Sequence, residues 1–175
     1  MAEKLTMPIS PKLLGKESVT VLNNRIADEF VAHYFYMNAA NWCNGVGFQN
    51  AAKFFQAESD NELAHAKGLQ DYLVGWNVDP IIPQVKTEYK ITSLVGIINE
   101  AYNLEYDLLQ KYMQGSELLM GKDLATFDFL QGYRQIQNDS VKEYADLLNV
   151  LEMLNLGEGD YNYKVIYFEN NYLKG

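Results

Sequence analysis

The amino-acid sequence predicts an all-α protein: a four-helix bundle with one long crossover between its second and third helices, followed by a short C-terminal fifth helix. Three observations predict this fold. All four prolines lie outside the long periodic stretches. Those stretches carry apolar residues at alternating spacings of four and three, which is the seam of a left-handed bundle. The connection at 76–91 is too long for a simple hairpin between neighbouring helices.

The first expected helix covers 16–44. It ends at NGVG (44–47), whose residues tolerate the left-handed backbone conformation. The second expected helix covers 48–75 and stops before DPIIP (79–83), because two prolines in five residues are incompatible with a continuing helix.

The third expected helix covers 92–120, and either Thr92 or Ser93 can cap it. The short turn MGKD (120–123) then leads into a fourth helix at 123–153. A turn this short makes the third and fourth helices antiparallel neighbours.

The crossover at 76–91 decides the topology. Its residues span about 50 Å when extended, whereas a helix of about 28 residues is about 42 Å long. The crossover therefore returns the third helix parallel to the second. NLGEGD (155–160) ends the fourth helix and leads into the short fifth one, expected at 161–172, and we expect 1–175 to form a single domain.

Composition and charge narrow the classes of function that the chain could have. The chain of 175 residues is 48% apolar and 21% charged, which is typical of a globular protein. A net charge of −9 argues against nucleic-acid and anionic-membrane partners and is compatible with handling cations. A single cysteine, Cys43, suits a reducing cytoplasm. No apolar run is long enough to span a membrane, and the N-terminus is too polar for a signal peptide.

The predicted seam is apolar at its ends and polar near its middle. Three carboxylates, Glu29, Glu62 and Glu105, and both histidines, His33 and His65, occupy these central positions, and the seam contains no Lys or Arg. Unpaired carboxylates are costly to bury, so a purely structural core would not place them there. Glu62 and His65 are three apart on one helical face. With the other carboxylates they form a sensible site for two iron-sized cations, which Glu62 can bridge.

Each of these residues also has a structural interpretation. A Glu-x-x-His pair by itself is usually a coincidence on a solvated face, and Tyr36 by itself is usually a core residue. His33 lies one turn from Glu29 and is either an accessory ligand or, as we favour, a supporting or core residue. Glu58 faces either a cation entry path or solvent.

Several stretches of the sequence together resemble the non-haem ferritins, of the bacterial type, over nearly the whole chain. These stretches are LNNRIADEF, YFYMNAANWC, NELAHAKGLQDYL, EAYNLEYDLLQ and TFDFLQGYRQIQ. The resemblance implies an iron-storing ferroxidase, in which two Fe(II) ions bind inside each subunit and O2 or H2O2 oxidises them. Ferric iron then forms a mineral inside a hollow homo-oligomeric shell of 24 subunits.

The resemblance also implies a role for each matching residue. Glu29, Glu62 and His65 would hold the first iron. Glu62 and Glu105 would hold the second, with Gln137 beside it. These five residues are therefore the expected metal ligands of the ferroxidase centre.

The resemblance assigns Tyr36 a hydrogen bond near the first iron and makes it a candidate electron donor. Other positions depart from the family pattern. Ser140 stands where these ferritins commonly carry a Glu near the second iron. The residues matching a third iron site are Asn61, Ile136, Asp139 and Ser140, of which only Asp139 is a carboxylate. A third iron site is therefore not expected to be intact.

No haem is expected. The residue after Glu62 is Leu63 rather than the haem-ligating Met of bacterioferritins, and Gln137-x-x-Ser140 replaces a second Glu-x-x-His. Two other functions stay open. One is a soluble di-iron peroxidase or oxygenase of the rubrerythrin type, disfavoured because the sequence has no Cys-x-x-Cys. The other is a structural ferritin subunit with a decayed centre.

Overall fold

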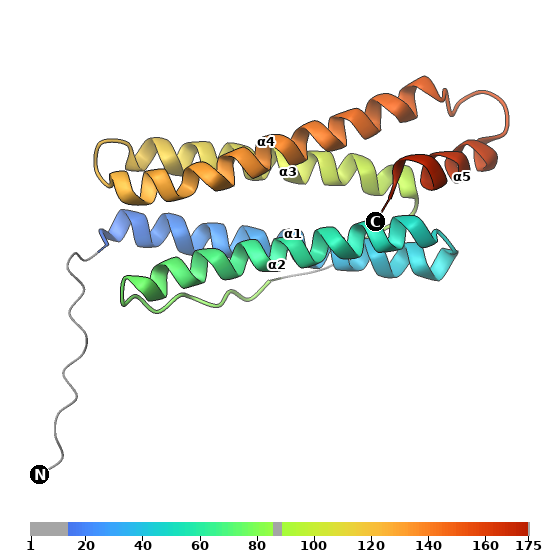
Figure 1. The fold of residues 1–175 in the computed structure, drawn as a ribbon. Helices are drawn as coiled ribbons and strands as arrows, with labels where there is room; N and C mark the ends of the chain where they lie inside the picture. Colours follow the sequence, from blue (N-terminus) through green and yellow to red (C-terminus); the bar gives the residue numbers. More distant parts are fainter. Residues whose placement is uncertain (1–13, 86–88, 175) are drawn as a thin grey trace, which may run out of the picture.

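The computed structural model describes residues 14–85 and 89–174. Within them the secondary structure consists of helices joined by turns and loops (Figure 1). The helices are α1 (Lys16–Val46), α2 (Gln49–Gly75), α3 (Leu94–Leu119), α4 (Leu124–Met153) and α5 (Tyr161–Tyr172). The predicted fold class, a four-helix bundle with a crossover and a short fifth helix, is confirmed. Pro8 and Pro11, which entered the prediction, lie outside the described residues.

Two antiparallel hairpins, α1–α2 and α3–α4, pack side by side (Figure 1). The crossover runs back along the bundle, so that α3 is parallel to α2, as its length predicted (Figure 1). Two hydrogen bonds attach this segment to α1: the Ile81 amide donates to Asn23 Oδ1 at 2.8 Å, and the Tyr89 hydroxyl donates to the Val31 carbonyl at 3.1 Å. No described helix is both long and apolar enough to cross a membrane.

The helix ends follow the chemistry of their sequence. The α1 helix ends at Val46, two residues beyond the expected end at 44, and Gly47 closes it with φ at 97°. Ser93, rather than Thr92, caps α3, and its hydroxyl accepts a hydrogen bond from the Gly96 amide at 3.0 Å. Asp123 caps α4 in the same way, by accepting from the Thr126 amide at 3.2 Å. These side chains replace backbone acceptors that the first turn lacks.

The start of α2 has no cap of its own, and a distant residue supplies one. Glu169, on α5, accepts hydrogen bonds from the amides of Asn50 at 2.6 Å and Ala51 at 3.1 Å. Glu169 is itself buried. The carboxylate therefore satisfies two free amides of α2 and fastens α5 to the end of the bundle.

The apolar core is divided into two clusters of buried residues. One includes Phe35, Phe55 and Ile98, and the other includes Leu22, Leu69 and Leu130. Buried polar side chains also occur between them along the helices. Two apolar ends with a polar middle are the pattern that the seam predicted.

One buried cation was not expected from the seam. Arg25 is only 8% exposed. Its guanidinium pairs with Asp28 at 2.6 Å and lies over the Tyr112 ring, 5.6 Å from the ring centroid. The ring and the carboxylate together offset the cost of burying this charge.

Candidate metal centre

All four long helices contribute a polar side chain to the middle of the bundle. Glu29 comes from α1, Glu62 and His65 from α2, Glu105 from α3 and Gln137 from α4. The three carboxylates and the amide are at most 2% exposed. His65 is partly exposed, so the centre has one side that approaches solvent.

Three of these residues form a compact group. Glu29, Glu62 and His65 each offer one ligand atom, and these atoms lie within 4.8 Å of one another. His65 Nδ1 is 3.2 Å from Glu62 Oε2 and 3.6 Å from Glu29 Oε2. Two carboxylates and an imidazole at such separations are a suitable donor set for a divalent transition metal such as iron. We call these three residues the triad.

Three buried oxygens of the expected metal ligands lack a hydrogen-bond donor among the described residues: Glu29 Oε2, Glu105 Oε2 and Gln137 Oε1. A buried polar atom without a partner costs free energy, and native proteins rarely keep several together. Cations bound between these ligands would satisfy such oxygens. Glu105, which is outside the triad, would contribute its free oxygen from the opposite hairpin.

The other oxygens of Glu29 and Glu105 are held by phenols. The Tyr36 hydroxyl on α1 donates to Glu105 Oε1, and the Tyr112 hydroxyl on α3 donates to Glu29 Oε1. Tyr36 was expected near the first iron, whereas its hydroxyl bonds to Glu105, an expected ligand of the second iron. Tyr112 was not among the expected site residues. The signal that could have found Tyr112 is its spacing, because each tyrosine follows a glutamate on its own helix by seven residues.

Burial and neighbouring charges favour protonated side chains in the metal-free centre. Burial raises the pKa of Glu62 well above its ordinary value. Burial also raises the pKa of Glu105 to about 7, although the hydrogen bond from Tyr36 opposes this shift. Burial alone would lower the pKa of His65, but Glu29 and Glu62 outweigh it and raise the pKa to about 10. A metal ion entering here would release protons.

His33 is not part of the triad, and its ring contacts Ser59 on α2. Its Nδ1 atom is 2.8 Å from the Ser59 carbonyl oxygen and 2.9 Å from the Ser59 hydroxyl oxygen. These contacts tie α1 to α2. They favour the interpretation of His33 as a supporting residue over that of a ligand.

A cavity of about 360 Å³ opens beside the triad between α2 and α4. Glu62 and His65 contribute to its wall. The four positions that match the third iron site implied by the resemblance also line this cavity: Asn61, Ile136, Asp139 and Ser140. The departures thus fall on one surface next to the centre.

Two further carboxylates, Glu58 and Glu143, line the same cavity. Burial, followed by the negative charge of Glu143, raises the pKa of Glu58 to about 7, although a hydrogen bond from Asn61 opposes the shift. Glu58 therefore faces the cavity beside the triad, one turn along α2 from Glu62, and it is partly buried.

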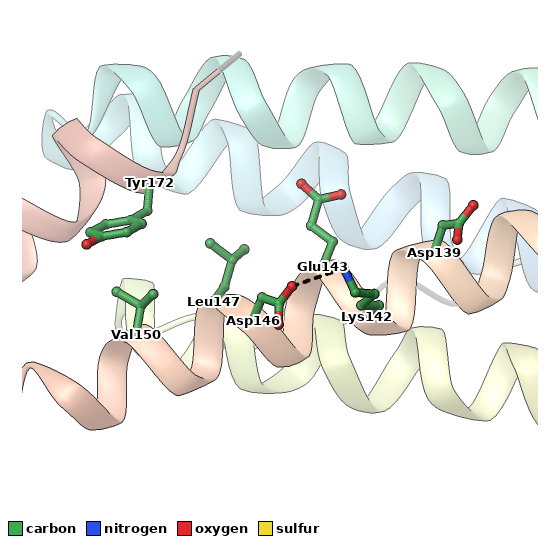
Figure 2. A pocket seen from close by; sticks show the side chains of 7 residues that line it. All are labelled: Asp139, Lys142, Glu143, Asp146, Leu147, Val150 and Tyr172. Carbon is green, nitrogen blue, oxygen red and sulfur yellow. Dashed lines mark ion pairs between the residues drawn. The ribbon is translucent and has the colours of Figure 1, made fainter.

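A second cavity, of about 430 Å³, lies further along α4 beneath the end of α5 (Figure 2). Tyr172 projects from α5 towards the apolar part of its wall (Figure 2). On its polar side Lys142 pairs with Asp146 at 3.6 Å. Asp139 and Glu143 line both cavities, so carboxylates extend from the triad along α4.

Comparison of the sequence with known proteins identifies the family to which it is similar. Residues 19–154 match the Ferritin-like domain family. The chain is 28% identical over 152 residues to a bacterial non-heme ferritin of Escherichia coli, covering 85% of this chain and 92% of that protein. It is also 28% identical over 144 residues to a bacterial non-heme ferritin of Campylobacter jejuni, covering 81% and 86%.

Solved structures agree with this fold. A humanized archaeal ferritin superposes with a TM-score of 0.82 at 20% identity, covering 90% of this chain and 94% of that one. An open pore ferritin from Archaeoglobus fulgidus superposes with a TM-score of 0.78 at 20% identity, covering 90% and 96%. Since the family match extends over most of the bundle, the chain belongs to the ferritin family.

Proposed function

We propose that this protein is a ferroxidase that stores iron. Fe(II) is its substrate: two ions bind inside each bundle, O2 or H2O2 oxidises them, and the ferric product is stored as mineral. The observation that carries the proposal is the triad of Glu29, Glu62 and His65, whose ligand atoms lie within 4.8 Å of one another in the middle of a ferritin-family bundle.

Each residue has a proposed role. Glu29 and His65 bind the first iron, and Glu62 bridges both irons. Glu105 binds the second iron through the oxygen that accepts no hydrogen bond from the described residues, and Gln137 lies beside it. Carboxylate oxygens are hard donors, so they stabilise Fe(III) more than Fe(II) and favour oxidation.

The cavity beside the triad supplies access. It is lined by Glu62 and His65 themselves and by three further carboxylates, those of Glu58, Asp139 and Glu143. Cations are attracted to such a wall. Ser140 leaves the second iron with fewer protein donors than a glutamate would, which keeps a coordination position open for the oxidant.

We also propose that the chain works as a homo-oligomeric shell of 24 subunits in the cytoplasm, the assembly implied by its resemblance to bacterial non-haem ferritins. The α5 helix exposes apolar and aromatic side chains that suit contacts between copies: Tyr161, Tyr163, Ile166, Tyr167 and Tyr172. Exposed patches of this kind commonly mark protein interfaces.

The test is to add a large excess of Fe(II) to metal-free protein in air and to measure iron per chain across a sizing column. A storage protein carries far more iron than its binding sites can hold, on a particle of several hundred kilodaltons. A small species that keeps only its site-bound iron would replace storage with a soluble di-iron enzyme. A large particle without iron uptake would indicate a structural subunit.

A further inference from the structure

The two phenols at the metal centre are placed with approximate two-fold symmetry. Tyr36 follows Glu29 by seven residues on α1 and donates to Glu105, on α3. Tyr112 follows Glu105 by seven residues on α3 and donates to Glu29, on α1. Each helix thus supplies one carboxylate and one phenol, and the hydrogen bonds cross between the helices. Tyr36 and Tyr112 are both fully buried.

We propose that Tyr112 is a second redox-active phenol of the centre. It gives an electron during O2 reduction at the Glu29 end, and Tyr36, the electron donor that the family resemblance implies, gives one at the Glu105 end. This inference rests on the proposed ferroxidase function. It adds a residue that is not among the site residues expected from the sequence.

The surroundings of the two phenols are also alike. The Tyr112 ring stacks on Tyr133, with ring centroids 5.5 Å apart and planes at 15°. The Tyr36 ring stacks on Tyr144, with centroids 6.1 Å apart and planes at 12°. Stacking of this kind fixes each ring in one orientation, so the hydroxyl keeps its direction towards the carboxylate.

Nearby tyrosines lack the feature that defines the pair. The Tyr133 hydroxyl donates to the backbone carbonyl of His65 at 3.1 Å, not to a ligand-type side chain. The hydroxyl of Tyr144 makes no hydrogen bond to a carboxylate among the described residues. Tyr133 and Tyr144 therefore serve as matched controls, because each is aromatic, close to the centre and stacked on one of the pair.

A second phenol would supply the last electron that the reduction of O2 to water requires. Two Fe(II) ions supply two electrons, which reduce O2 only to the level of hydrogen peroxide. Two phenols supply the remaining two electrons and two protons. In total, two Fe(II), two phenols, one O2 and two protons from solvent give two Fe(III), two phenoxyl radicals and two waters. Each radical then takes one electron from a further Fe(II) and one proton from solvent, which restores the phenol.

The experiment uses the assembled metal-free protein loaded anaerobically with two Fe(II) per chain and mixed with O2. Samples frozen after mixing are examined by electron paramagnetic resonance for a tyrosyl radical, and released hydrogen peroxide is measured in parallel. The variants are Tyr36→Phe, Tyr112→Phe and the double variant, with Tyr133→Phe and Tyr144→Phe as controls. Circular dichroism and Zn(II) binding check that each variant is folded and keeps its centre.

The expected result is a radical signal that persists in either single variant, disappears in the double variant and is unchanged in the controls. Released peroxide should rise in each single variant and rise further in the double one. A merely structural Tyr112 would alter metal affinity but neither of these readouts. If Tyr112→Phe does not fold, a variant that combines Tyr36→Phe with Tyr133→Phe and Tyr144→Phe decides. A signal that remains there supports Tyr112, because the two stacked tyrosines and Tyr36 have all been removed.

Two outcomes would overturn the inference. One is the loss of all radical signal in Tyr36→Phe. The other is wild-type signal and wild-type peroxide yield in a folded Tyr112→Phe protein. Both leave iron oxidation by the wild-type protein intact, so they are distinguishable from failure of the proposed function, in which the wild-type protein consumes neither Fe(II) nor O2.

Discussion

The Tyr36 hydroxyl on α1 donates a hydrogen bond to the Glu105 carboxylate on α3, and so joins the two hairpins of the bundle at its centre. The second oxygen of Glu105 is buried and accepts no hydrogen bond from any described residue. One oxygen is thus fixed and the other is left available. This is the arrangement that a preorganised metal ligand requires.

The first prediction concerns this hydrogen bond. Tyr36→Phe leaves the buried carboxylate of Glu105 without its donor and should lower the free energy of unfolding of the metal-free protein by about 1–3 kcal/mol. Urea titration followed by circular dichroism measures the change. Tyr144→Phe is the control, since it removes a buried hydroxyl that holds no carboxylate. Equal losses in the two variants would show that the Tyr36 hydrogen bond adds nothing specific.

The second prediction concerns the bridging ligand. Glu62→Ala should weaken Zn(II) binding by about 100-fold or more, since even groups that only support a ligand cost 10–100-fold when removed. Isothermal titration calorimetry measures the affinity. Glu58→Ala is the matched control, because Glu58 lines the same cavity one turn away on α2 but is not part of the triad. Unchanged Zn(II) affinity in Glu62→Ala would rule out the bridge.

The third prediction concerns pH. Burial raises the pKa of Glu105 from 4.5 to about 7, and its carboxylate neighbours raise that of His65 from 6.5 to about 10 despite burial. Between pH 4.5 and about 7, Glu105 binds more protons in the folded protein than in the unfolded one. The same holds for His65 between pH 6.5 and about 10. The metal-free protein should therefore lose stability as the pH rises from about 4.5 to 10, by on the order of 3 kcal/mol from Glu105 alone.

Thermal unfolding at a series of pH values measures how the stability of the metal-free protein changes with pH. Glu105→Gln should remove the loss of stability between about pH 4.5 and pH 7, because the amide does not titrate. Bound Zn(II) should reverse the trend, since the metal replaces the protons and binds more tightly as the pH rises. A metal-free protein whose stability increases from pH 5 to 8 would contradict the prediction.

The fourth prediction concerns the departure at Ser140. This residue lines the cavity with Glu62 and His65. Ser140→Glu should strengthen binding of the second divalent ion, because opposite charges about 4 Å apart attract by about 4 kcal/mol at an effective dielectric constant of about 20, before desolvation is deducted. Ser140→Gln controls for side-chain length without the charge. Identical second-site affinities in the two variants would contradict the prediction.

The fifth prediction concerns the docking of α5. Glu169→Ala removes the acceptor for the amides of Asn50 and Ala51 and should cost about 0.5–2 kcal/mol, as the loss of other helix caps does. Hydrogen exchange should accelerate in α5 and in the first turn of α2, but not in the centre of the bundle. Asn171→Ala is the control, since its exposed side chain donates within α5, to the Tyr167 carbonyl. Unchanged exchange in α5 would show that other contacts hold this helix.

The sequence determined the helices, their connectivity and the faces they bury. Periodicity alone distinguishes core from surface positions, and the length of the crossover allows the chain to return along the bundle (Figure 1). The same periodicity located Glu29, Glu62 and Glu105 in the seam, and all three are buried. These features depend on local spacing, which is fully present in the chain.

Only the tertiary structure decided which side chains meet. The bond from Tyr112 to Glu29, the contact between His33 and Ser59, and the cap that Glu169 gives to α2 all join separate helices. Such contacts depend on how far each helix is rotated and shifted against its neighbour, which side-chain packing sets. A position in the apolar seam predicts that a side chain points into the bundle. It does not predict which group on the opposite helix that side chain will contact.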